Sequence, residues 1–218
     1  PLTSCAAPLV LIFHFHVFSL ACLLLNIHVY LQPDRMVEID KDFPKLLPFG
    51  FLKTLHWVAP FAFIVTIYAG SFMFGGISFS LLVAWNAFVY SLITWICYLL
   101  QINKKTFQVG QGVLWIPFAL MDFLVCALFF VLFAIVTLIC IICIFQSFKY
   151  KIGVFLTYFF ATAFSMISGA AYGYYTLRLY QSCPNGQLRN LSTLVVEGTT
   201  ISTKETFTNT SPDPRPTA

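Results

Sequence analysis

Asp122 is the residue whose type and position most strongly suggest chemistry. It is the only acidic residue well inside an apolar run, and a charged side chain at the centre of a bilayer costs at least about 2.5 kcal/mol. One interpretation is a proton or ion path, which would need a chain of polar groups, whereas the runs offer mainly Asn86 and a few threonines. The other is that Asp122 hydrogen-bonds a neighbouring helix or reaches the headgroup level. We favour this second interpretation.

Cysteines and histidines also form suggestive pairs. Cys140 and Cys143 have the spacing of a redox or zinc half-site, but they lie in an apolar run with no second pair, which favours packing. His14 and His16 are two residues apart and would point to different sides of a helix, so we predict no metal site. Cys183 directly follows the last apolar run and is a candidate for S-palmitoylation.

The other signatures of catalysis are missing from the sequence. It has no glycine-rich phosphate loop, no Ser-His-Asp set in a suitable context and no paired carboxylates beyond Asp40 and Asp42, which read as a solvated flank. We therefore expect a protein that is not an enzyme and needs no cofactor.

The elements that position these residues are long apolar runs. The chain is 59% hydrophobic and only 9% charged, whereas soluble domains carry about 25% charged residues. The net charge of +4 is small, and the basic residues lie beside the apolar runs rather than in one block. Nucleic acid is therefore not the implied partner. The composition predicts an all-α integral membrane protein with a four-helix bundle. The predicted helices span about residues 55–74, 79–100, 113–145 and 152–177.

The chain divides into four predicted parts. Residues 1–35 are hydrophobic, and we expect either translated sequence upstream of a start at Met36 or a fifth helix over about 8–31. Residues 36–54 form a lead-in, and 55–178 form the four-helix membrane domain. Residues 179–218 are rich in Thr, Ser and Pro and are predicted to be a disordered tail.

Basic residues predict the orientation of the four-helix body, because cytoplasmic loops carry the excess of Lys and Arg. With both ends inside, the outer side holds only Lys149 and Lys151. Both ends should then be cytoplasmic and the acceptor sequence at Asn190 unmodified. The basic residues counted on the inner side are Lys41, Lys45, Lys53, Lys104, Lys105, Arg178 and Arg189.

A stripe of small residues marks the last predicted helix. Ala161, Ser165, Gly169 and Gly173 recur every four residues and therefore share one face. Lipid tails give helices no hydrophobic reason to associate, so close backbone approach over small residues is a main source of packing energy. We expect this face to be the tightest helix contact, made either within the bundle or with another copy, and favour the first.

Several short motifs resemble the MARVEL superfamily of tetraspan proteins. Residues 47–57 (LPFGFLKTLHW) are similar to the entry into the first helix of the physins. Residues 87–91 (AFVYS) and 98–101 (YLLQ) are similar to the end of their second helix, and 121–124 (MDFL) is similar to the start of the third helix across the superfamily. The short loops are closer to the myelin-and-lymphocyte and chemokine-like-factor branches.

The resemblance implies a non-catalytic role in membrane organisation or vesicle traffic, at the plasma membrane or on vesicles. The expected partners are membrane lipids, including cholesterol, and other membrane proteins or further copies of the chain. A loose cholesterol-type pattern at Leu92, Tyr98 and Lys104 agrees with this expectation. The alternative function is a small channel or transporter subunit that uses Asp122.

Overall fold

Four long helices dominate the computed structural model, which describes residues 40–203 apart from 105–106, 110–111, 115–116 and 184–186. The helices are α2 (Phe49–Ala69), α3 (Ile77–Leu99), α4 (Phe118–Ser147) and α5 (Ile152–Gln181). The shorter elements are the 3₁₀ helices η2 (Phe43–Lys45), η3 (Ile102–Lys104) and η5 (Leu188–Thr193) and the strands β1 (Phe107–Val109), β2 (Gly112–Leu114), β3 (Leu194–Glu197) and β4 (Thr200–Thr203).

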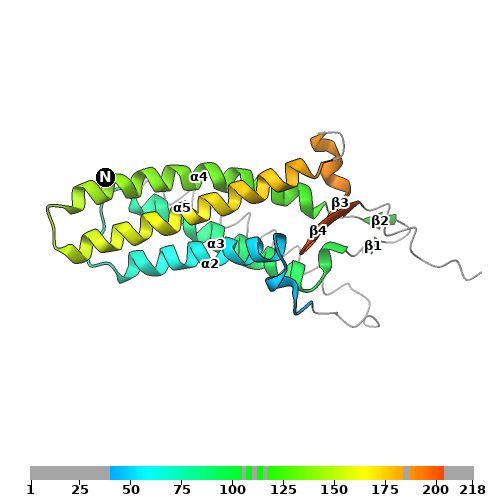
Figure 1. The fold of residues 1–218 in the computed structure, drawn as a ribbon, viewed down its shortest axis with the longest axis horizontal. Helices are drawn as coiled ribbons and strands as arrows, with labels where there is room; N and C mark the ends of the chain where they lie inside the picture. Colours follow the sequence, from blue (N-terminus) through cyan, green and yellow to red (C-terminus); the bar gives the residue numbers. More distant parts are fainter. Residues whose placement is uncertain (1–39, 105–106, 110–111, 115–116, 184–186, 204–218) are drawn as a thin grey trace, which may run out of the picture.

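The four long helices lie side by side in one elongated bundle (Figure 1). Each packs against two neighbours, so α2, α3, α4 and α5 form a ring in which α2 and α4 lie across from each other. Aromatic side chains fill the centre, where Phe63, Phe133 and Tyr172 are fully buried. The rings of Phe133 and Tyr172 stack with their centroids 5.7 Å apart. Such close contacts supply the dispersion energy that holds helices together in lipid.

All four helices are long and apolar enough to cross a membrane. This confirms the predicted class, an all-α protein with four membrane-spanning helices. The most apolar is α4, whose mean hydropathy reaches 3.3 over its best window. With 30 residues each, α4 and α5 are about 45 Å long, longer than the roughly 30 Å hydrocarbon core of a bilayer.

Two predicted helix starts were wrong. The first helix begins at Phe49, not near residue 55, because its first-turn amides already have an acceptor: Phe49 N and Gly50 N both donate to the Gly198 carbonyl, at 2.9 and 3.2 Å. The third begins at Phe118, not near residue 113. Pro117 biases the residue before it towards extended backbone, and residues 112–114 instead pair with 107–109 as an antiparallel ladder.

The predicted disorder of the tail is wrong for residues 187–203. Helix α5 continues to Gln181, and β3 and β4 then form an antiparallel hairpin that turns at Gly198. The hairpin lies at the end of the bundle where α2 begins (Figure 1), which we call the hairpin end. Leu191, Leu194 and Val196 are buried there. The composition of the tail did not predict this structure, because the apolar run here is short. Its side chains become buried only by packing against helices that are distant in the sequence.

The remaining sequence predictions of organisation lie outside the described residues. These are the start at Met36 or fifth helix, the histidines of the first 35 residues, and the end of the tail after Thr203.

Candidate functional site

A buried ion pair lies at the centre of the bundle, towards the hairpin end. Lys53 Nζ lies 2.7 Å from Asp122 Oδ2, and both side chains are only 1% exposed. Lys53 is in the second turn of α2 and Asp122 is in the second turn of α4. Because these helices lie across the ring from each other, the pair joins opposite sides of the bundle.

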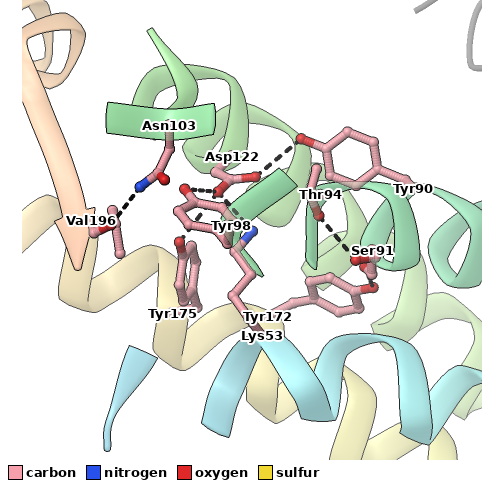
Figure 2. A network of polar contacts seen from close by, with 10 residues as sticks. All are labelled: Lys53, Tyr90, Ser91, Thr94, Tyr98, Asn103, Asp122, Tyr172, Tyr175 and Val196. Carbon is pink, nitrogen blue, oxygen red and sulfur yellow. Dashed lines mark hydrogen bonds and ion pairs between the residues drawn. The ribbon is translucent and has the colours of Figure 1, made fainter. Parts of the chain in front are cut away.

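Three tyrosines complete the surroundings of the carboxylate (Figure 2). Tyr98 donates to Asp122 Oδ2 at 2.6 Å, Tyr175 donates to the same oxygen at 3.3 Å, and Tyr90 donates to Oδ1 at 3.2 Å. Tyr90 and Tyr98 belong to α3 and Tyr175 to α5. All four helices therefore meet at one carboxylate.

The ammonium group is held by aromatic rings as well as by the carboxylate. Lys53 Nζ lies 4.7 Å from the ring centroid of Tyr175 and 5.0 Å from that of Tyr98. Cations are attracted to ring faces at such distances, more strongly where water is excluded. Tyr98 and Tyr175 thus contact both charges: their hydroxyls donate hydrogen bonds to Asp122, and their rings lie against the ammonium of Lys53.

A second layer of polar contacts extends from this pair towards the middle of the bundle. The rings of His56 and Tyr172 stack with centroids 4.3 Å apart, and Tyr172 OH donates to the His56 carbonyl at 3.0 Å. The hydroxyls of Ser91 and Tyr172 lie 2.8 Å apart. This layer joins α2, α3 and α5 without adding a further charge between them.

The chemical consequence of this geometry is that the charges are neutralised in place. An ionised group in a low-dielectric interior is tolerated only when it is paired and hydrogen-bonded. Here the carboxylate receives one ammonium and three hydroxyl donors. Among the sequence interpretations of Asp122, this arrangement matches a hydrogen bond to neighbouring helices, with four partners rather than one.

Sequence reasoning missed the partners of Asp122. Lys53 was predicted as a flanking charge at the interface, which is wrong, because its side chain is buried inside the bundle. One signal could have found it: a lone Lys and a lone Asp each stand near one end of an apolar helix, and in lipid such charges pair. Tyr90 and Tyr98 are eight residues apart, a spacing that places both on one face of α3.

The predicted small-residue stripe of α5 faces α4 of the same chain. Ala161, Ser165 and Gly169 are buried, and Ser165 Oγ lies 3.0 Å from Thr137 Oγ1 of α4. A Cβ at Gly169 would lie 3.5 Å from Phe133 Cβ, in ordinary contact. The fourth member, Gly173, is only half-buried and lies against the ring of Phe130.

The predicted acylation site, Cys183, is buried just beyond the end of α5. Its thiol donates to the Leu179 carbonyl at 3.5 Å, and burial raises the pKa of the thiol. Both effects disfavour the thiolate, the nucleophilic form. S-palmitoylation of Cys183 stays a prediction, and it requires the thiol to swing out of this position first. Cys140 and Cys143 are buried in α4.

The fold and the site define a multi-pass helical membrane protein with one ion pair buried between its helices. Comparisons with family models, with curated proteins and with solved structures found no match.

Proposed function

We propose that this protein is a non-catalytic tetraspan protein that organises membrane or accompanies cargo in vesicle traffic. The observation that carries the proposal is the complete engagement of Asp122 by Lys53 and three tyrosines. The buried ion pair of the described helices is occupied in fastening them together. The proposal agrees with the resemblance of residues 47–57 and 121–124 to MARVEL tetraspan proteins.

The outer surface of the bundle supports the same proposal. Large apolar side chains point outwards along α4 and α5, including Leu138 at 62% exposure, Ile142 at 56% and Phe159 at 51%. Such a surface is suited to lipid rather than to an aqueous substrate. A protein of this kind acts through what its lipid-facing surface and its helix contacts hold in place.

A small channel or transporter subunit is the second candidate, favoured by the presence of an ionisable pair within membrane-spanning helices. Tyrosine hydroxyls around Asp122 could relay protons only if the pair opened. The nearby Tyr172 hydroxyl contacts the carbonyls of His56 and Ala87 and the hydroxyl of Ser91, all in the interior of the bundle. The second candidate therefore requires Asp122 to exchange its contacts with Lys53 and the three tyrosines for others.

Two measurements on the full-length protein test the proposal. The first reconstitutes the protein in vesicles and follows proton and ion flux with entrapped dyes. We expect the flux to be no faster than the leak measured in vesicles without protein. The second depletes the protein from its own cells and compares the protein content of purified vesicles and plasma membrane, where we expect cargo to be redistributed. Flux that disappears in Asp122→Asn would establish the second candidate. Unchanged membrane protein content after depletion would contradict the proposal.

A further inference from the structure

An open apolar groove runs along the outside of the bundle between α4 and α5. Its volume is about 600 Å³, within the range of sites that hold small organic ligands, roughly 300–1,000 Å³. Phe123 and Phe130 of α4 form one wall, and Tyr174 and Leu177 of α5 form the other. The groove faces outwards from two membrane-spanning helices, so lipid rather than water surrounds it.

Small residues create the groove. Ala170 and Gly173 line it where α5 approaches α4, and a Cβ at Gly173 would lie only 2.8 Å from the ring of Phe130. The ring of Phe130 thus lies close against α5 at Gly173, and the exposed Ala170 leaves the space beside that ring open.

The length of the groove corresponds to one leaflet. Its lining on α5 extends from Ala170 to Tyr180, next to the end of the helix at Gln181. Ten residues of helix rise roughly 15 Å, half of the roughly 30 Å hydrocarbon core. A second membrane-spanning helix would need contact along the whole core, whereas an acyl chain of one leaflet needs this length.

A cation is held beside the groove at its end nearest the hairpin end. Arg178 Nε donates to Tyr174 OH at 2.8 Å, and the guanidinium lies 5.0 Å from the ring centroid of Tyr174. Tyr174 itself lines the groove, so the hydrogen bond ties the cation to the groove wall. Guanidinium groups bind phosphate through paired N–H donors, and a group already held in place loses little entropy when it binds.

We propose that the groove holds an anionic phospholipid from the leaflet at the hairpin end. One acyl chain lies between Phe130 and Leu177 over the floor of Ala170 and Gly173, and Arg178 binds the phosphate and its anionic headgroup. The inference goes beyond the proposed function, because it assigns a specific lipid class to one surface of the protein.

The test is photolabelling of the full-length protein in vesicles that contain phosphatidylserine or phosphatidylcholine with a photoreactive group near the end of one acyl chain. Cross-linked peptides are mapped by mass spectrometry. We expect labelling within residues 123–130 and 170–180, with phosphatidylserine favoured about fivefold, the preference that one basic group near an anionic surface gives. In Arg178→Gln this preference should disappear while labelling persists.

A matched pair of variants separates the groove from the general lipid surface. Ala170→Leu fills the groove and should reduce labelling there by more than half. Ala134→Leu makes the same change at an exposed alanine of α4 and should leave labelling unchanged. Equal labelling by both lipids, or wild-type labelling of Ala170→Leu with intact helicity, would overturn the proposal. Cross-links between two copies through residues 123–130 or 170–180 would assign the groove to a dimer and overturn it as well.

Discussion

At the scale of single residues, the strength of the polar centre depends on the donors that surround Asp122. A hydrogen bond to an ionised group contributes about 1.5–3 kcal/mol, and the shorter bonds are the stronger ones. Tyr98 makes the shortest of the three hydroxyl contacts, at 2.6 Å, and its ring also lies beside Lys53. The tyrosines are therefore not equivalent, and Tyr98 should matter most.

Tyr98→Phe should lower the free energy of unfolding by about 1.5–3 kcal/mol, because it removes the donor and leaves the ring. Tyr90→Phe is the matched control. It removes a longer 3.2 Å contact to the other carboxylate oxygen and should cost less than Tyr98→Phe. Both are measured by thermal unfolding in detergent. A larger loss in Tyr90→Phe, or none in either variant, would contradict this ranking.

The sequence predicted only one half of this polar centre. Asp122 stands out because it interrupts an apolar run, whereas Lys53 lies near the end of its run, where basic residues usually reach the headgroups. How deep Lys53 lies in the bundle depends on how many residues of α2 precede it. That extension is set by Gly198, which is 145 residues further along the chain, and no local pattern reports such a contact.

At the scale of elements, α4 and α5 form the most extensive helix pair, and the small-residue stripe lies between them. Close approach at Gly169 leaves room for one methyl group, since a Cβ there would be 3.5 Å from Phe133 Cβ. A larger side chain must displace Phe133, whose ring stacks on Tyr172. The stripe is thus linked to the aromatic centre of the bundle.

Gly169→Leu should lower the free energy of unfolding by about 1–3 kcal/mol, the usual cost of overpacking a core. Gly169→Ala should be tolerated because its methyl group fits. Phe159→Leu is the control on the same helix, at a side chain that is 51% exposed. The readouts are the thermal midpoint in detergent and retention in the early secretory pathway. Wild-type behaviour of Gly169→Leu in both assays would show that the stripe does not make a close contact.

The existence of the four helices could be predicted because each run exceeds the length needed to cross a bilayer. Their ends could not be predicted as well. The start of α2 depends on an acceptor from the tail, and the start of α4 depends on Pro117 and on a strand pair before it. Apolar run length reports burial in lipid, but helix ends are set by hydrogen bonds.

At the scale of the whole molecule, the β3–β4 hairpin closes the end of the bundle above the ion pair. It accepts hydrogen bonds from the first turn of α2 through Gly198 and from Asn103 Nδ2 through the Val196 carbonyl, at 2.7 Å. Helix N-termini need such acceptors because their first amides have no partner within the helix. The hairpin thereby ties the tail to α2 and to the segment after α3.

Leu194→Asp should release the hairpin, because it places a charge at a position that is 3% exposed. The amides of Phe49 and Gly50 then lose their acceptor, and hydrogen exchange of the peptide 47–53 should accelerate at least tenfold. Thr199→Asp is the control, since it lies exposed in the hairpin turn. Unchanged exchange in Leu194→Asp would mean that the hairpin does not protect α2.

The basic residues of the loops predict how the molecule is oriented in the membrane. Because Lys53 is buried, it leaves the count of flanking charges, and six of the seven basic residues counted on the inner side remain against Lys149 and Lys151. The excess still favours a cytoplasmic hairpin end. We predict that Asn190 carries no glycan in cells. A control protein with an acceptor sequence in a long flexible insertion after Tyr150 should be glycosylated, and the reverse pattern would contradict the orientation.

The central claim is that Lys53 and Asp122 exist to fasten the helices together, and a double-mutant cycle tests it most directly. Removing one partner of a buried pair costs about 3–5 kcal/mol, whereas replacing both with apolar residues is often nearly neutral. The measurement is the free energy of unfolding of Lys53→Met, Asp122→Leu and the double variant in the same detergent. We predict a large loss in each single variant and recovery of most of it in the double variant. A double variant whose loss equals the sum of the two single losses would contradict the claim.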